Sequence, residues 1–96
     1  MDLLVTYDID TSDREGERRL ARVAKVCEGY GVRVQYSVFE CRLSEVAALR
    51  LSHDLKDVIE PTVDSVRFYR IPGSIEDIRT SIGREPPHTW GEPWIV

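Results

Sequence analysis

The order in which strand-like and helix-like periodicities succeed one another constrains the fold of this chain most. Apolar residues alternate over 3–9, recur at helical spacing over 11–31, and form a β-rich run over 32–43. A second helical pattern over 44–59 precedes a second alternating run over 64–71. The sequence therefore predicts a strand, a helix, a strand or strand pair, a helix and a strand, and then a tail.

This order is typical of an α+β fold, the ferredoxin-like βαββαβ sandwich, in which one antiparallel sheet carries both helices on the same face. The 96 residues are predicted to form a single domain, 1–96, with a core over 1–71 and a C-terminal strand and tail over 72–96. The run over 32–43 exceeds the usual strand of about 5–6 residues, so it is either one bent strand or two strands. It contains no glycine turn signal that would decide between them.

The two faces of the first predicted strand differ in character. One face is apolar throughout and is predicted to pack in the core: Leu3, Val5, Tyr7 and Ile9. The other face begins apolar and ends polar: Leu4, Thr6 and Asp8. We expect a second copy of the chain to cover this face, giving a homodimer with stacked sheets. The apolar end of the tail, 93–96, is predicted to add an edge strand to the partner's sheet.

Cap residues mark where both predicted helices begin. Thr11, Ser12 and Asp13 are N-cap candidates for the first helix, and Ser44 is the candidate for the second. Apolar stripes at helical spacing predict the core-facing sides, which are Leu20, Val23, Ala24, Cys27 and Tyr30, then Ala48, Leu51, Leu55, Val58 and Ile59. In the last alternating run we expect packed side chains at Val66, Phe68 and Tyr69. A short strand is predicted within 74–83.

A row of cations occupies the side of the first helix opposite its apolar stripe. At 100° per residue its members fall within about 80° of one another. The row consists of Arg14, Arg18, Arg22 and Lys25, with Arg19 beside it. Such a row suits a phosphate backbone, although a solvated helix face has the same pattern. Arginines within predicted strands, where charge is less expected, favour phosphate contacts: Arg33, Arg42, Arg67 and Arg70.

Composition limits the classes of function. The formal net charge of −4 argues against a general nucleic-acid coat, although a binding face needs only local positive charge. The sequence lacks both an apolar run of roughly 20 residues and a signal-peptide pattern, so we expect a cytoplasmic protein with no membrane partner. Cys27 and Cys41 have no CxxC spacing and are predicted to be buried core residues rather than metal ligands.

Asp8 is the candidate for metal chemistry. It ends the first strand on the face that a second copy is predicted to cover, so two Asp8 carboxylates would approach each other and favour a cation between them. Mg²⁺ suits such a site, because it accepts one or two carboxylates and keeps waters that phosphate can displace. A site of this kind supports phosphodiester hydrolysis. The alternative is that Asp8 only turns the chain into the first helix.

Several stretches taken together resemble one known family. The stretch "VTYDIDTSDREGERRLARVAKVCEGYGVRVQYSVFEC", with "DSVRFYRI" after it, is similar to the CRISPR-associated protein two family, the small partner of the spacer-acquisition integrase. The likeness runs from the first strand through about residue 71. The combination of "YGVRVQYSVFEC" with "RFYR" resembles the form found with type I-C CRISPR systems.

The resemblance implies a ferredoxin-like homodimer that binds duplex DNA and bridges two dimers of the integrase subunit, CRISPR-associated protein one, during spacer acquisition. It also implies an endonuclease that acts on RNA or double-stranded DNA with Mg²⁺, or Mn²⁺ in its place. Asp8 in "TYD" matches the metal-site and catalytic aspartate of the family. Asp10 is expected at most to contact residues that bind the metal, and not to bind the metal itself. Family positions of less defined role are matched by Ser37, Phe39 and Arg18 or Arg19.

Three functions stay open at this point. A DNA-binding scaffold would hold duplex phosphates with the cations Arg14, Arg18, Arg19, Arg22, Lys25 and Arg33. A metal-dependent endonuclease would act through paired Asp8 residues, and one protein can do both. A toxin-like endoribonuclease on the same fold is the third option, because function depends on the site rather than on the fold.

Overall fold

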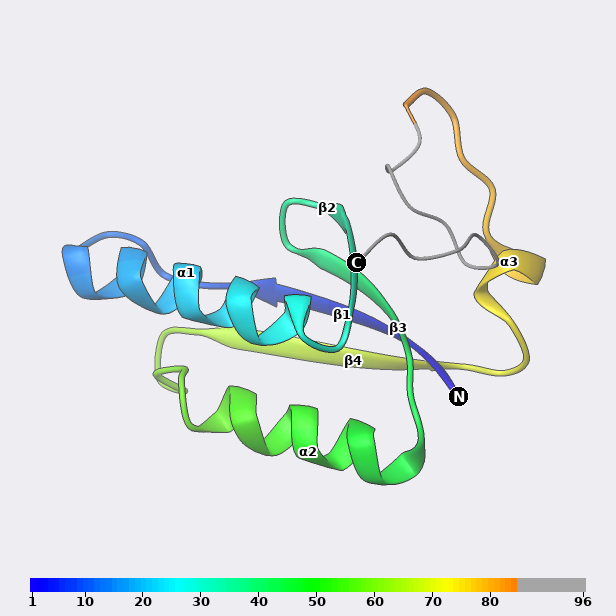
Figure 1. Ribbon diagram of the computed structural model, residues 1–96. Coiled ribbons are helices and arrows are strands. Elements are labelled where there is room, and N and C mark those ends of the chain that lie inside the picture. The colour runs from blue at the N-terminus through cyan, green and yellow to red at the C-terminus, as the bar shows by residue number, and fades with distance from the viewer. Residues whose placement is uncertain (85–96) are drawn as a thin grey trace.

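The computed structural model describes residues 1–84, and its elements have the predicted order (Figure 1). They are β1 (Asp2–Asp8), α1 (Arg14–Glu28), β2 (Gly31–Gln35), β3 (Val38–Arg42), α2 (Glu45–Lys56), β4 (Ser65–Ile71) and α3 (Ile75–Ile78). The predicted α+β fold with βαββαβ order is therefore confirmed. The edge strand predicted at 93–96 lies outside the described residues.

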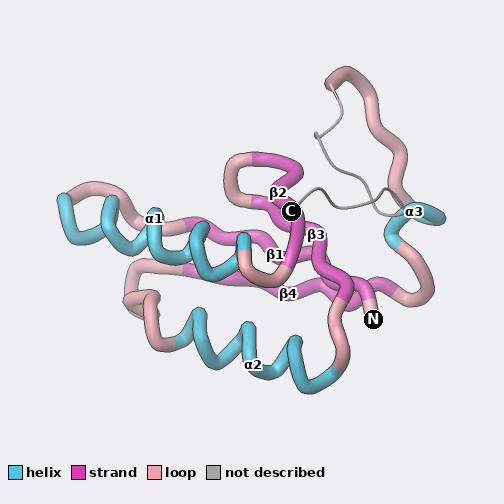
Figure 2. The backbone as a smooth tube through the Cα atoms, in the orientation of Figure 1, coloured by secondary structure: helices cyan, strands magenta, loops and turns pink. Residues whose placement is uncertain are grey.

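All four strands join in one antiparallel sheet with the order β2-β3-β1-β4. β1 is an interior strand, since it pairs with β4 along its whole length and with β3 over residues 2–6. Leu4, for example, lies between Glu40 and Tyr69. Figure 2 shows α1 and α2 together on one face of this sheet. The position of Asp8 at the end of β1 is thus fixed by hydrogen-bonded neighbours rather than by a loop.

The core lies between the sheet and the two long helices. The apolar face of β1 is buried as predicted, with Ile9 the most exposed of its four residues at 7%. The side chains packed against it from β3 and the helices include Phe39, Cys41, Val23, Cys27, Leu51 and Leu55. The predicted stripe on α1 is less complete, because Leu20, near the middle of the helix, is 37% exposed.

Both long helices begin at predicted caps. The Asp13 carboxylate accepts a hydrogen bond from the Gly16 backbone amide at 2.8 Å, and the Ser44 hydroxyl accepts one from the Ala47 amide at 3.1 Å. Each cap satisfies an amide that has no partner within its own helix. The predicted starts of both helices are therefore confirmed.

Three local expectations are resolved or corrected by the structure. The run over 32–43 is two strands, β2 and β3, joined through a turn at Tyr36 and Ser37. The short strand predicted within 74–83 is wrong, because the chain forms the short helix α3 there. Phe68 and Tyr69 are not packed; they are 39% and 45% exposed, since β4 is an edge strand whose outer side is uncovered.

Cys27 and Cys41 are free and buried, as predicted. Burial raises the pKa of the Cys27 thiol to about 11 and that of Cys41 to about 12. Both thiols therefore stay protonated near neutral pH, and metal binding needs the thiolate. In the described part of the chain, no helix is both long and apolar enough to cross a membrane.

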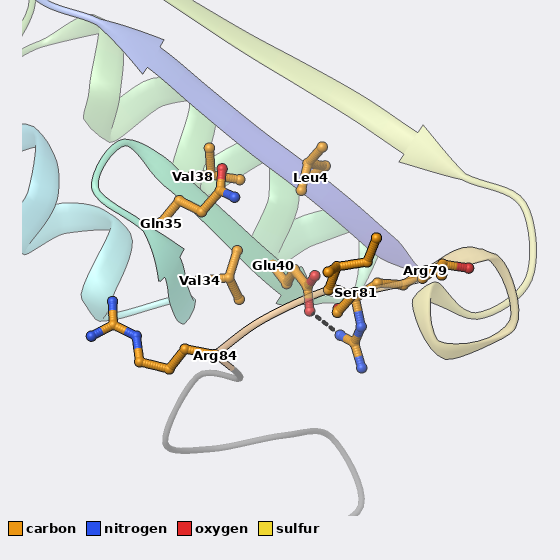
Figure 3. Close-up of a pocket in the computed structure, with 10 residues that line it drawn as sticks. Leu4, Val34, Gln35, Val38, Glu40, Arg79, Ser81 and Arg84 are labelled. Atoms are coloured by element: carbon orange, nitrogen blue, oxygen red, sulfur yellow. Dashed lines mark hydrogen bonds and ion pairs between the residues drawn. The ribbon is translucent and has the colours of Figure 1, made fainter.

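The sheet face away from α1 and α2 is exposed in part, and we call it the open face. By strand alternation it carries Asp2, Leu4, Thr6 and Asp8 of β1, Val38, Glu40 and Arg42 of β3, and Ser65, Arg67, Tyr69 and Ile71 of β4. Residues 79–84 run across part of it (Figure 3) and line, with Leu4, Val34 and Val38, a pocket of about 320 Å³. Arg79 fastens this segment by an ion pair of 2.6 Å to Glu40, which is buried.

A second ionic network holds the other end of β1. The buried Asp2 carboxylate accepts two hydrogen bonds of 2.8 Å from Arg42, and one from the Ile75 amide at the start of α3. Arg42 also contacts Glu76 at 2.7 Å. The hydrogen bonds from Arg42 are the main reason that the pKa of Asp2 falls to about 2. One carboxylate thus ties together β1, β3 and α3.

We predict that Asp2→Asn destabilises the protein in a pH-dependent way. Because the folded-state pKa lies below the ordinary 3.8, the stabilisation is fully present above about pH 4 and is lost as the pH falls toward 2. The substitution should lower the free energy of unfolding by about 2 kcal/mol at pH 7. Urea unfolding at pH 7 and at pH 3 measures this difference.

Asp77→Asn is the matched control, because Asp77 is an exposed carboxylate of α3. It should leave the free energy of unfolding close to that of the wild type at both pH values. A deficit for Asp2→Asn that has the same size at pH 7 and pH 3 would show that ionisation of Asp2 does not supply the stabilisation.

Candidate functional site

Asp8 is the last residue of β1, where it pairs with Ser65 of β4. Its side chain is exposed, and among residues 1–84 its carboxylate has no hydrogen-bond or ion-pair partner. The turn into α1 uses other aspartates, since Asp10 accepts a hydrogen bond from the Ser12 amide at 2.9 Å and Asp13 caps the helix. The structure therefore gives Asp8 no part in turning the chain, which leaves its oxygens available for a ligand.

Arg67 is the cation nearest to Asp8 in the strand register of the open face. It pairs with Thr6, two residues before Asp8, and its side chain lies on the same face of the sheet. Its guanidinium donates a hydrogen bond of 3.2 Å to the Tyr69 hydroxyl, a neutral partner that leaves the positive charge uncompensated. The sequence identified Arg67 only as one of several strand arginines, and the register is what places it on the same face as Asp8, with its guanidinium directed toward Tyr69.

The loop after Asp8 is held by a buried ion pair between Arg19 and Asp64. The Asp64 side chain is fully buried, and it accepts hydrogen bonds from Arg19 Nε at 2.8 Å and from the backbone amides of Asp10 and Glu60 at 3.0 and 2.8 Å. Burial alone would raise the pKa of Asp64, but these hydrogen bonds together hold it below its ordinary value. Asp64 is therefore a charged, fully engaged carboxylate at neutral pH.

The cation row on α1 is present as predicted. Arg14, Arg22 and Lys25 are exposed and have no carboxylate partner among the described residues. Arg18 is exposed as well and pairs with Glu15 at 2.7 Å across one helical turn. Arg19, predicted to lie beside this row, turns inward toward Asp64. A buried carboxylate without a cationic partner would be strongly destabilising, and Arg19 supplies that partner.

The other predicted site residues, Arg33, Ser37 and Phe39, lie in β2, in β3 and in the turn between them. Arg33 sits on the helix-covered side of β2, with its guanidinium 5.3 Å from the Phe39 ring centre and an ion-pair distance of 3.9 Å to Glu28. Phe39 is completely buried and stacks with Tyr7, so its role is packing. Ser37 contributes its backbone carbonyl, which accepts a hydrogen bond from the Tyr7 amide at 3.1 Å.

Two of the remaining strand arginines serve internal ion pairs. Arg42 binds Asp2 and Glu76, and Arg70 lies 3.2 Å from Glu45 of α2. Their presence in strands is thus explained by carboxylates in neighbouring elements. The idea that all strand arginines contact phosphate is not needed to explain them.

The predicted residues form two separate places on the molecule. Asp8 and Arg67 lie on the open face, whereas the cation row projects from the outer side of α1, which covers the opposite face of the sheet (Figure 1). Within residues 1–84, no three side chains of the His, Cys, Asp and Glu types come together as a metal-binding group.

Comparisons with known proteins identify the family of this chain. Residues 1–75 match the family model described as CRISPR associated protein Cas2. The CRISPR-associated endonuclease Cas2 of Halalkalibacterium halodurans is 39% identical over 93 residues, which are 97% of each chain. The CRISPR-associated endoribonuclease Cas2 of Chlorobaculum tepidum is 48% identical over 67 residues, which are 70% of each chain.

Solved structures show the same relationship in three dimensions. The crystal structure of Streptococcus pyogenes Cas2 at pH 6.5 superimposes with a TM-score of 0.79 at 40% identity, covering 86% of this chain and all of that one. A further crystal structure of Cas2 covers the whole chain with a TM-score of 0.71 at 29% identity. With the family model, the relatives and the fold in agreement, this chain belongs to the CRISPR associated protein Cas2 family.

Proposed function

We propose that this protein is a metal-dependent endonuclease whose site is built from Asp8 of two subunits. The observation that carries the proposal is the exposed carboxylate of Asp8 at the end of an interior strand, which has no partner among the described residues. Relatives named endonuclease or endoribonuclease support a phosphodiesterase activity. The substrate class is RNA or double-stranded DNA.

The residues fit Mg²⁺ or Mn²⁺ only if two chains share the ion. Mg²⁺ in proteins is commonly held by one or two carboxylates together with waters and substrate phosphate. One Asp8 from each of two subunits meets that need, whereas one chain supplies a single carboxylate. When bound, such a metal would neutralise phosphate charge and provide an activated water for hydrolysis.

The proposed homodimer stacks the open faces of two sheets. The open face carries the apolar side chains of Leu4, Val38 and Ile71 beside its charged ones, so a second copy would remove apolar surface from water. Arg67 adds positive charge to the same open face, since it has no carboxylate partner among the described residues, and this charge would favour an approaching phosphate.

We predict that Asp8→Asn abolishes most Mg²⁺-dependent cleavage. Losing even an outer-shell partner of a metal typically costs about 10–100-fold, so loss of the ligand itself should cost at least about a hundredfold. Cleavage of duplex DNA and of RNA, measured with Mg²⁺ and with EDTA, quantifies the effect. The stability of the variant should stay near that of the wild type, because Asp8 is exposed.

Asp77→Asn removes an exposed carboxylate at the other end of β1, on α3, and is the control for the loss of charge. It should cleave as the wild type does. Cleavage by Asp8→Asn at the wild-type rate would refute the role of Asp8 in the reaction.

A second function, a DNA-binding scaffold, is favoured by the cation row on α1. Arg14, Arg22 and Lys25 are exposed along one side of a 15-residue helix and lack carboxylate partners in the described part of the chain. A row of this kind binds duplex phosphates with a strong salt dependence. We propose that the row holds duplex DNA during spacer acquisition while the integrase subunit docks elsewhere.

The assignment to type I-C systems stays a prediction.

We predict that Arg14→Glu combined with Arg22→Glu weakens duplex binding and reduces its salt dependence. Each phosphate contact contributes a slope of about 0.9 in log affinity against log salt concentration, so the slope should fall by about 2. Fluorescence anisotropy over a series of salt concentrations measures both quantities. Arg50→Glu with Lys56→Glu changes the net charge equally on α2 and should leave the slope almost unchanged.

If both double variants reduce the slope equally, the effect comes from net charge and the row has no special role. The two proposed functions are separable in this way, because the charge reversals on α1 leave Asp8 and the open face untouched.

A further inference from the structure

The buried carboxylate of Asp64 joins three segments that are far apart in the sequence. Its side chain is 0% exposed and lies immediately before β4. One oxygen accepts the Asp10 amide at 3.0 Å, and the other accepts Arg19 Nε and the Glu60 amide, each at 2.8 Å. The loop after β1, the helix α1 and the turn before β4 therefore meet at one charged group.

The peptide groups of Asp10 are held from both directions. Asp64 accepts the Asp10 amide, and the Arg19 guanidinium donates to the Asp10 carbonyl at 3.4 Å. Gly16 packs so closely against the same carbonyl that a Cβ added there would lie 1.9 Å from the oxygen. The loop at Asp10 is thus held by an ion pair on one side and by α1 on the other.

Asp8 lies only two residues before this fixed point. β3 pairs with β1 as far as Thr6, and the Ser37 carbonyl accepts the next amide, that of Tyr7, so at Asp8 itself the strand is paired with β4 alone. The register places Asp8 opposite Ser65, the residue directly after Asp64. The contacts of Asp64 therefore hold both strands at the point where the candidate metal ligand stands.

We propose that the Arg19–Asp64 ion pair is a positioning device that fixes the direction of the Asp8 carboxylate, and that Arg19 makes no contact with nucleic acid. The inference rests on the proposed function for its catalytic consequence. The alternative is that Arg19 turns outward and binds phosphate together with its neighbour Arg18. The two arginines are adjacent, carry the same charge and differ in burial, with side chains 18% and 58% exposed.

The test compares the same substitution at both positions, Arg19→Gln and Arg18→Gln. Amide hydrogen exchange at Asp10 and paramagnetic broadening of the Asp8 and Ile9 amide signals by Mn²⁺ report on the loop without requiring cleavage. Arg19→Gln should speed Asp10 exchange at least about tenfold and weaken the Mn²⁺ effect, because the loop loses its anchor. Arg18→Gln should leave both as in the wild type.

Cleavage kinetics give a second and different signature. Arg19→Gln should lower kcat about ten- to hundredfold with little change in KM for the duplex, because a small misplacement of a reacting group is costly. Arg18→Gln should leave kcat unchanged and raise KM. If both variants raise KM alike and Asp10 exchange stays slow, Arg19 is a phosphate contact and the inference is overturned.

Gly16→Ala keeps both charged side chains and displaces the Asp10 carbonyl by a different route. If circular dichroism shows that Arg19→Gln is unfolded, Gly16→Ala tests whether the Asp10 loop positions Asp8. Faster Asp10 exchange with a weaker Mn²⁺ effect supports the inference, whereas faster exchange with an unchanged Mn²⁺ effect overturns it. A wild-type protein that neither cleaves nor responds to Mn²⁺ at Asp8 overturns the proposed function instead, and Asp10 exchange in Arg19→Gln still tests the anchor.

Discussion

The pairing of β1 with strands on both of its sides is the constraint on which the rest of this structure depends. The apolar face of this interior strand packs against both helices, and its other face belongs to the open face that carries Asp8. The two ionic groups at its ends, Asp2 with Arg42 and Asp64 with Arg19, then fix the neighbouring segments at each end of the strand. A central strand held at both ends is a rigid support for a single functional carboxylate.

Much of the fold could be predicted because its causes are local in the sequence. Alternation in 3–9 correctly separates the buried residues from Asp8, and the cap positions Asp13 and Ser44 show where the helices begin. These signals need only neighbouring residues. The sequence does not decide the split of 32–43 into β2 and β3, because the turn at Tyr36 and Ser37 uses neither glycine nor Asn-Gly.

The candidate site could be predicted less completely because its supporting contacts are distant in sequence. Arg19 and Asp64 are 45 positions apart, and no periodicity links a helix arginine to an aspartate before an edge strand. In the sequence alone, Arg19 is therefore indistinguishable from the cations of the α1 row. Alternation overestimates the burial of Phe68 and Tyr69 for a related reason, since it shows which face a residue occupies but not whether its strand lies at the edge of the sheet.

The ion pair between Arg79 and Glu40 has a consequence for assembly. It fastens residues 79–84 over part of the open face, where a second sheet would have to stack. A partner subunit must either displace this segment or accept it as a layer within the interface. In the first case the free energy of releasing the ion pair is subtracted from the free energy of association. The dimer dissociation constant would then depend on the Glu40 carboxylate and the Arg79 guanidinium.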